Sequence, residues 1–543
     1  MQRGGSAGSR TQVPASAGRP PRPSGRGRPP GYRRPPLRVR WRRQSLLVKA
    51  GYMLATLVAV VAVIAGIGVF AIYHKLDSNI TKVSVGHLSG KTVYGSLNIL
   101  VLGSQTRLGQ NGNFGYDATP GVSNSDNLLL IHLDPTHTHA IVLSIPRDTF
   151  VYQPACQERA YVGTGVWPAQ QYPPGAIIDG ALNIGGPTCA VQTVEDLTGI
   201  QLDHFVEFNF NSFRTMVGQL GGVEVCVPPG PGYHDVNANL NLSPGLHWVD
   251  YDQALAYVRQ RHDLGGPDAG GDLPRIQVQQ AFVSSVMQKV NSKGLLTNIP
   301  SLLSIATTAT QNVTVDDGLG SVSALMHLAE SLAHLQAKNV SLITMPTTTD
   351  TFDYPAYDQH LMQVEPQDDV LFQLLATGQP WTGGLPTEPY GSVQVQVLNG
   401  TGQTGLAAQT ADQLKALGFD VVGTGDAPYT STTTVSYAGL AQADGAYTLM
   451  AALKKFPAGQ NTLTEPAPQE GSPGTVILTL GADFDGVPQP TPAQPAASAT
   501  ASKGGSGKTT APAPAPSSSA TAVQSRNAGA SICSGLPPAY TGG

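Results

Sequence analysis

The hydrophobic pattern begins with one long apolar run at residues 50–73, AGYMLATLVAVVAVIAGIGVFAIY, which is free of formal charge. An α-helix rises about 1.5 Å per residue, so a run of this length can cross a hydrocarbon layer of roughly 30 Å. Tyr52 and Tyr73 lie near its ends, where aromatic rings often meet the membrane interface. A secretory signal has a shorter apolar stretch followed by a small-residue cleavage site. The pattern therefore predicts a transmembrane helix.

Short apolar runs bounded by turn residues then indicate an α/β domain over residues 92–347. LNILVLG (97–103), NLLLIHL (127–133) and HAIVLSI (139–145) are predicted strands, and the last two are joined by DPTHT as a hairpin. Helical spacing follows at three segments, which are 187–199, 250–262 and 273–290. The fold class expected is a mixed sheet flanked by helices.

A second small α/β domain is predicted at residues 392–485, where strands such as VQVQVLNG alternate with two amphipathic segments. The remaining segments lack such patterns. We expect a disordered basic tail at 1–49, a polar stalk at 74–91, a connecting segment and Gly/Pro linker at 348–391, and a disordered Ala/Pro/Ser-rich tail at 486–543.

Charge gives the expected orientation. Residues 1–49 hold 13 of the 32 Lys and Arg and no Asp or Glu, so the other 494 residues carry 19 basic and 36 acidic side chains. Basic flanks stay in the cytoplasm. We expect a single-pass protein of the cell membrane, with its N-terminus cytoplasmic and its bulk outside. A basic arm can also bind nucleic acid, but a tail beside anionic lipid is the simpler reading, and no nucleic acid is expected as a partner.

The extracytoplasmic setting makes the four cysteines disulfide candidates, and four cysteines allow three full pairings. Cys156–Cys189 is the preferred pair.

Arginines follow the predicted strands and helices of the first domain. Arginine forks match phosphate oxygens two at a time, so scattered arginines that converge can hold an anion with several phosphates. Asp126 and Asp148 lie in the same loops, and a carboxylate beside phosphate suits Mg²⁺. The competing interpretation is that each arginine makes only a surface ion pair. The arginines are Arg107, Arg147, Arg259, Arg261 and Arg275.

An ordered series of motifs favours arginines that converge on an anion over separate surface ion pairs, because the series resembles the LytR-CpsA-Psr family across essentially all of 92–347. The series is NILVLGSQTR (98–107), SDNLLL (125–130), SIPRD (144–148), ALNIGGPTCAVQTVEDLTGI (181–200), DHFVEFNFNSF (203–213), LGGVEVCVP (220–228), ALAYVRQRH (254–262) and RIQVQQ (275–280). Residues 392–485 resemble the LytR C-terminal domain that often follows this unit.

The resemblance implies a phosphotransferase that moves an anionic glycopolymer from a polyprenyl-pyrophosphate carrier onto peptidoglycan, with the polyprenyl tail in an apolar groove. It implies that Arg147, Asp148, Arg259 and Arg261 are catalytic and that Asp126, with Gln105, holds Mg²⁺. Asp148 either orients an arginine or acts as a base. The pyrophosphate would be bound by Arg107, Arg147, Arg259, Arg261, Arg275 and Gln279.

Two positions depart from the family pattern. Gln105 replaces an aspartate, and a neutral amide is a poorer Mg²⁺ ligand than a carboxylate. Val278 replaces an arginine, which removes a cation from the expected clamp.

Two further functions stay open at this point. The same clamp with water as acceptor would hydrolyse polyprenyl pyrophosphate, and a non-catalytic envelope regulator or lipid-binding protein would need no chemistry. Retained arginines favour either enzyme, whereas Gln105 and Val278 favour the binding protein.

Overall fold

The structure is a computed structural model of the 543-residue chain. It describes residues 46–88, 95–104, 124–158, 165–169, 176–262, 264–265, 271–291, 307, 310–311, 313–332, 335–349, 361–455, 458–461, 474–488 and 523–539.

The chain divides into two units, residues 1–71 and 72–543. Helix α2 (Leu46–Asn79) holds the long apolar run, and within it Met53–Asn79 is long and apolar enough to cross a membrane. The helix continues to Asn79, so the first part of the expected stalk is helical. The expected stalk is also not polar throughout, because Leu76, Ile80 and Leu88 are buried.

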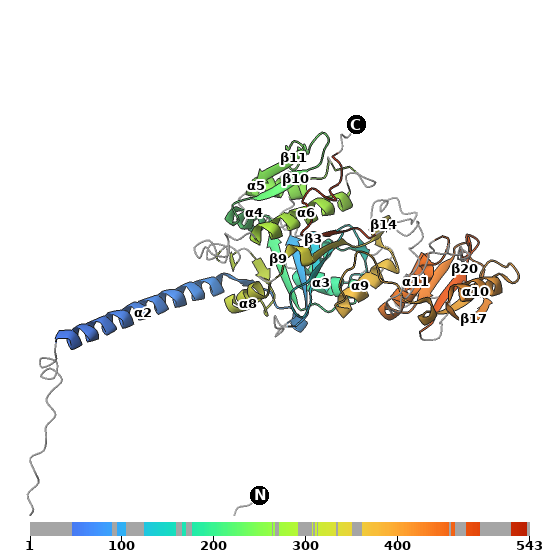
Figure 1. Cartoon of the computed structure of the whole chain (residues 1–543), viewed down its shortest axis with the longest axis horizontal. Coiled ribbons are helices and arrows are strands. Elements are labelled where there is room, and N and C mark those ends of the chain that lie inside the picture. Colours follow the sequence, from blue (N-terminus) through green and yellow to red (C-terminus); the bar gives the residue numbers. More distant parts are fainter. Residues whose placement is uncertain are drawn as a thin grey trace, which may run out of the picture. The chain divides into compact units, whose positions relative to one another are not determined.

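A mixed sheet forms the centre of the larger unit (Figure 1). It has eight strands in the order β1-β12-β9-β2-β3-β4-β13-β21. The predicted hairpin is present as β3 and β4, which pair antiparallel. β2 runs antiparallel to β3 and parallel to β9, while β4 runs parallel to β13. The strands are β1 (Thr81–Lys82), β2 (Leu97–Ser104), β3 (Ser125–Leu133), β4 (Ala140–Ile145), β9 (His204–Asn209), β12 (Val313–Val315), β13 (Val340–Thr344) and β21 (Ser525–Asn527).

Alternation along these strands creates two apolar faces, because successive side chains of a strand point to opposite sides. Leu100 and Leu130 face one side, where they pack with Val191 of α3 (Gly180–Thr198). Ile99 and Val142 face the other side, which α8 (Val322–Leu332) and part of α6 (Asp272–Val290) cover.

A second layer packs against one side of α6, and the two share an apolar core of their own. It contains α4 (Phe210–Gln219), the hairpin β10 (Val223–Val227) and β11 (Gly245–Val249), and α5 (Tyr251–Arg259). Asn209 and Asp250 cap α4 and α5 by accepting hydrogen bonds from backbone N–H groups of the first turns. These caps fix where α4 and α5 begin beside the sheet.

The C-terminal domain has a five-stranded sheet in the order β17-β16-β20-β18-β19. Its strands are β16 (Gln394–Asn399), β17 (Asp420–Asp426), β18 (Thr434–Tyr437), β19 (Ala458–Asn461) and β20 (Val476–Leu480), and its helices are α10 (Leu406–Leu417) and α11 (Ala443–Ala451). The remaining short elements are β5 (Phe150–Val151), β6 (Cys156–Gln157), β7 (Val166–Trp167), β8 (Ala176–Ile177), β14 (Thr347–Thr349), β15 (Leu361–Gln363) and four 3₁₀ turns, η1 (Gly86–Leu88), η2 (Ala337–Asn339), η3 (Tyr390–Ser392) and η4 (Leu440–Gln442).

The segment expected to be a connection, 348–391, contains helix α9 (Gln367–Thr377). Leu371 and Phe372 of this helix are fully buried in the core of the central sheet, while Val370 belongs to the core of the C-terminal domain. The predicted connecting segment thus includes a helix that was not predicted, and the apolar residues of this helix belong to two cores.

Part of the C-terminal tail also differs from the prediction. Residues 523–539 are ordered against the first domain, although composition predicted disorder for all of 486–543. β21 adds an edge strand to β13, and Cys533 forms a disulfide with Cys226 of β10. The other disulfide joins Cys156 to Cys189, the pair preferred from the sequence.

Candidate active site

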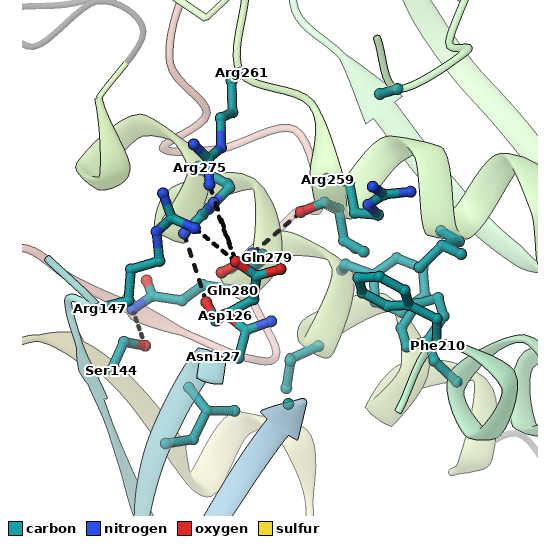
Figure 2. Close-up of a pocket in the computed structure, with 18 of the residues that line it drawn as sticks. Asp126, Asn127, Ser144, Arg147, Phe210, Arg259, Arg261, Arg275, Gln279 and Gln280 are labelled. Atoms are coloured by element: carbon teal, nitrogen blue, oxygen red, sulfur yellow. Dashed lines mark hydrogen bonds and ion pairs between the residues drawn. The ribbon is translucent and has the colours of Figure 1, made fainter. Parts of the chain in front are cut away.

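A cavity of about 610 Å³ lies between the end of the central sheet and the layer of α4, α5 and α6. One part of its wall is apolar, with aliphatic and aromatic side chains from both layers. The other part is polar, and Figure 2 shows Arg147, Arg261 and Arg275 there beside Asp126. The apolar residues include Leu129, Val142, Phe210, Phe213, Leu255, Val258, Phe282, Val283 and Leu342, and the charged residues are Asp126, Arg147, Asp235, Arg259, Arg261 and Arg275.

Strand pairing places Asp126 next to Arg147. Leu128 of β3 lies opposite Ile145 of β4 in the antiparallel register, and continuing that register by two residues sets position 126 opposite position 147. The two side chains meet, with Arg147 Nη1 at 2.7 Å from Asp126 Oδ1. The sequence motifs SDN and SIPRD thus meet at one end of the sheet.

Two further arginines reach the same carboxylate from the second layer. Arg261 Nη2 lies 3.9 Å and Arg275 Nη1 lies 4.0 Å from Asp126 Oδ1. Figure 2 shows Arg147, Arg261 and Arg275 converging above Asp126. Three of the five predicted arginines therefore cluster around one carboxylate.

Asp272, which the sequence analysis missed, is ion-paired with two arginines of this cluster. It begins α6, and its carboxylate is ion-paired with Arg275, three residues further along the helix. Its Oδ2 also accepts a hydrogen bond from the backbone N–H of Arg147 at 3.1 Å. The signal that could have found it is its i, i+3 spacing to Arg275.

Burial and repulsion lower the pKa of Arg261 to about 10, with Arg275 and Arg147 as the repelling cations. In contrast, the carboxylates of Asp126, Asp148 and Asp272 outweigh burial and raise the pKa of Arg147. The cavity end near Arg261 thus carries positive charge in a partly dehydrated setting, which favours an anion.

Asp148 is ion-paired with Arg147, with its Oδ1 3.3 Å from Arg147 Nε, and its side chain does not line the cavity. Asp179, also missed, lies behind the same loop: its backbone N–H donates to Arg147 O and its side chain accepts from Asn124 Nδ2. Burial raises the pKa of Asp179 to about 6.

Helix α6 contributes amides to the cavity wall. Gln279 Nε2 donates to Val258 O at 3.1 Å, and Gln280 Nε2 donates to the hydroxyls of Ser144 and Thr344. Val278 is fully buried in the core of the second layer. The position where the family carries an arginine is thus occupied by a core side chain.

Arg259 is apart from the other arginines. It ends α5, and its guanidinium stacks over the ring of Phe210 at 4.7 Å from the ring centre. Figure 2 shows it on the apolar side of the cavity. Gln105 and Arg107, the remaining predicted ligands, lie outside the described residues.

Comparison with known proteins assigns the chain to a family. The profile of the LytR_cpsA_psr family matches residues 68–368. The chain belongs to this family. Residues 392–484 match a second family, the LytR cell envelope-related transcriptional attenuator.

Curated relatives of this family member include the cell wall biosynthesis protein LcpA of Corynebacterium glutamicum, 28% identical over 63% of this chain and 69% of that protein. Another is the polyisoprenyl-teichoic acid–peptidoglycan teichoic acid transferase TagT of Bacillus subtilis, 29% identical over 45% of this chain and 66% of that protein. Among solved structures, a LytR-Csp2A-Psr enzyme from Actinomyces oris is 22% identical with a TM-score of 0.39, covering 56% of this chain and 97% of that one.

Proposed function

We propose that this protein is a phosphotransferase that moves an anionic glycopolymer from a polyprenyl-pyrophosphate carrier to peptidoglycan. The observation that supports the proposal is that one cavity has a cationic end and an apolar wall. Arg147, Arg261 and Arg275 converge at its polar end, whereas Phe213 and Phe282 belong to its apolar wall. A lipid pyrophosphate has the same two parts, an anionic head and an apolar tail. The names of the relatives support the same function.

We assign roles to the cationic groups from their positions. Arginine forks bind phosphate oxygens and stabilise the charge that develops on the transferring phosphoryl group and on the leaving polyprenyl phosphate. Asp272 and Asp148 hold Arg147 in place before the substrate arrives, which lowers the cost of ordering it. Arg259 packs on Phe210 and is suited to the region where head and tail meet.

Mg²⁺ is part of the proposal. Asp126 offers one carboxylate, and Ser104 and Asn127 add neutral oxygens to the same wall. Mg²⁺ takes one or two carboxylates when phosphate oxygens complete its shell, so these donors fit the ion. Because Arg147 already lies at 2.7 Å from the carboxylate, we expect Mg²⁺ to bind together with the donor. When bound, the ion supplies Lewis-acid stabilisation of phosphate charge.

The proposed location is the outer side of a cell membrane, with a single span and a cytoplasmic N-terminus. The basic flank of residues 1–49 supports this orientation. Two disulfides, which are typical of oxidising compartments, support it independently.

The test uses the full-length protein in detergent with a polyprenyl-pyrophosphate-linked oligosaccharide, peptidoglycan oligomers and Mg²⁺. Arg147→Ala is compared with Arg214→Ala, whose arginine pairs with Asp252 away from the cavity. We expect mass spectrometry to detect a phosphodiester-linked conjugate with the wild type and with Arg214→Ala, but not with Arg147→Ala. Release of polyprenyl phosphate without a conjugate would instead indicate the hydrolase. Bound but unreacted lipid would indicate a binding protein.

A further inference from the structure

An aspartate–histidine pair, Asp235 and His262, lines the same cavity as the arginines. Asp235 is buried, with 1% of its surface exposed. Its Oδ2 accepts hydrogen bonds from the backbone N–H of Arg261 at 2.8 Å and from Nδ1 of His262 at 3.2 Å. Its Oδ1 accepts from the backbone N–H groups of Asn237 and Ala238. The carboxylate thus joins the 235–238 loop to the segment that carries Arg261 and His262.

These contacts select the tautomer of the neutral imidazole. Burial alone would raise the pKa of Asp235, but the N–H groups of Arg261, Ala238 and His262 lower it below its ordinary value. An ionised carboxylate at Nδ1 selects the tautomer in which Nδ1 carries the proton. The lone pair is then on Nε2, which accepts a hydrogen bond from Nδ2 of Asn237 at 3.2 Å, and an acceptor hydroxyl would take the place of this amide.

The place of His262 suits contact with a large acceptor. Its side chain is 60% exposed, so a polymer can reach it from solvent. It directly follows Arg261, whose guanidinium lies 3.9 Å from Asp126. His262 is the one imidazole among the described residues that line the cavity. The other acidic groups of the wall are occupied, since Asp126 faces three arginines and Asp235 accepts backbone hydrogen bonds.

We propose that His262 is the general base that deprotonates the acceptor hydroxyl, and that Asp235 is its positioning residue. This inference rests on the proposed function. Nε2 takes the proton as the acceptor oxygen forms a bond to the phosphorus that carries the glycan. The bond from that phosphorus to the bridging oxygen breaks, and its electron pair leaves with polyprenyl phosphate. The proton then passes from the exposed imidazole to water.

The first experiment compares His262→Gln with His327→Gln, a control histidine that is 53% exposed on α8 and remote from the cavity lining. Transfer by the full-length protein is measured from about pH 5.5 to 9, together with donor binding. A positioned base contributes roughly 10²- to 10⁴-fold, so we expect a loss of that order for His262→Gln with unchanged donor affinity. The pH dependence of the wild-type rate should differ from that of the variant, because the variant lacks the imidazole.

A second pair of measurements separates catalysis from structure. Added imidazole should restore part of the activity of His262→Ala and none of the activity of Arg147→Ala. Asp235→Asn should lower kcat at least 10-fold, because it removes the charge that selects the tautomer. It should leave KM for the donor within about 3-fold, because the amide oxygen can still accept from the backbone N–H of Arg261. His262→Gln with a wild-type rate and pH profile would overturn the base assignment while leaving the transferase in place. A wild type that forms no conjugate would overturn both proposals.

Discussion

Arg147 Nη1 lies 2.7 Å from Asp126 Oδ1, and this ion pair joins the ends of two adjacent strands at the floor of the cavity. Arg261 and Arg275 also reach the carboxylate within 4.0 Å. Asp126 therefore offsets the mutual repulsion of three guanidinium groups until an anion arrives.

Replacement of Asp126 by Asn should destabilise the free protein and strengthen its response to anions. Losing a part-buried charge partner costs roughly 2 kcal/mol, so we expect a lower Tm without ligand. Inorganic pyrophosphate should raise the Tm of Asp126→Asn more than that of the wild type, because it replaces the missing negative charge. Thermal unfolding with and without pyrophosphate measures both effects. Equal pyrophosphate shifts in the two proteins would contradict the cluster around Asp126.

Magnesium should act through the same residue. We expect Mg²⁺ to lower the Kd of the wild type for the polyprenyl-pyrophosphate donor, since the Asp126 carboxylate would hold the ion and the ion would offset phosphate charge. The Kd of Asp126→Asn should change little on addition of Mg²⁺, because its neutral amide is a weak ligand. Isothermal titration of the donor, with and without Mg²⁺, reports binding without catalysis. A Mg²⁺ effect of the same size in Asp126→Asn would place the ion elsewhere.

Three strands of the central sheet were predictable because they are continuous apolar runs. Residues 97–103, 127–133 and 139–145 appear almost unchanged as β2, β3 and β4. Of the predicted clamp, Arg147, Arg261 and Arg275 converge, whereas Arg259 lies against Phe210. The helix explains this difference, since α5 ends at Arg259 and Gln260 has extended backbone angles. Two arginines that are two positions apart then point to different parts of the cavity.

Other features depend on contacts that no local pattern contains. β21 has only three residues, and Cys533 lies 307 residues from its partner Cys226. Both lie in a tail whose Ala/Pro/Ser-rich composition predicts disorder, so neither the strand nor the pairing could be predicted. Asp235 and Asp272 were missed for a related reason, because an aspartate in a loop or at a helix start usually faces solvent. Only the fold shows that these two are buried and paired.

The Cys226–Cys533 disulfide should stabilise the first domain against unfolding. It closes a very long loop, and the loss of a native disulfide typically costs 2–5 kcal/mol. We expect Cys533→Ser and Cys226→Ser to lower the unfolding free energy by similar amounts, and the double variant by no more than either. Denaturant unfolding under non-reducing conditions measures this. A double variant with the sum of the two losses would show that the cysteines act separately.

Deletion of residues 523–543 should have a further effect that Cys533→Ser lacks. β21 pairs with β13 and covers the edge of the central sheet. Removing it exposes a row of unpaired backbone groups, which are a template for association. We expect the deletion variant to self-associate in detergent, while Cys533→Ser stays dispersed because its β21 sequence is intact. Light scattering of the two variants at equal concentration distinguishes them, and a dispersed deletion variant would show that β21 does not protect this edge.

Asp179 should make stability depend on pH in the direction opposite to a salt-bridged carboxylate. Burial raises its folded pKa to about 6 from an ordinary value of 3.8. The folded state therefore binds more protons than the unfolded state between about pH 4 and 6, so this residue destabilises the fold increasingly as pH rises through that window. Asp179→Asn removes the penalty and keeps an oxygen that can accept from Asn124. We expect the variant to be more stable than the wild type at pH 7, by at most about 3 kcal/mol, and the gain to vanish near pH 4. Urea unfolding at a series of pH values gives the difference directly, and a gain that persists unchanged at pH 4 would exclude titration of Asp179 as its cause.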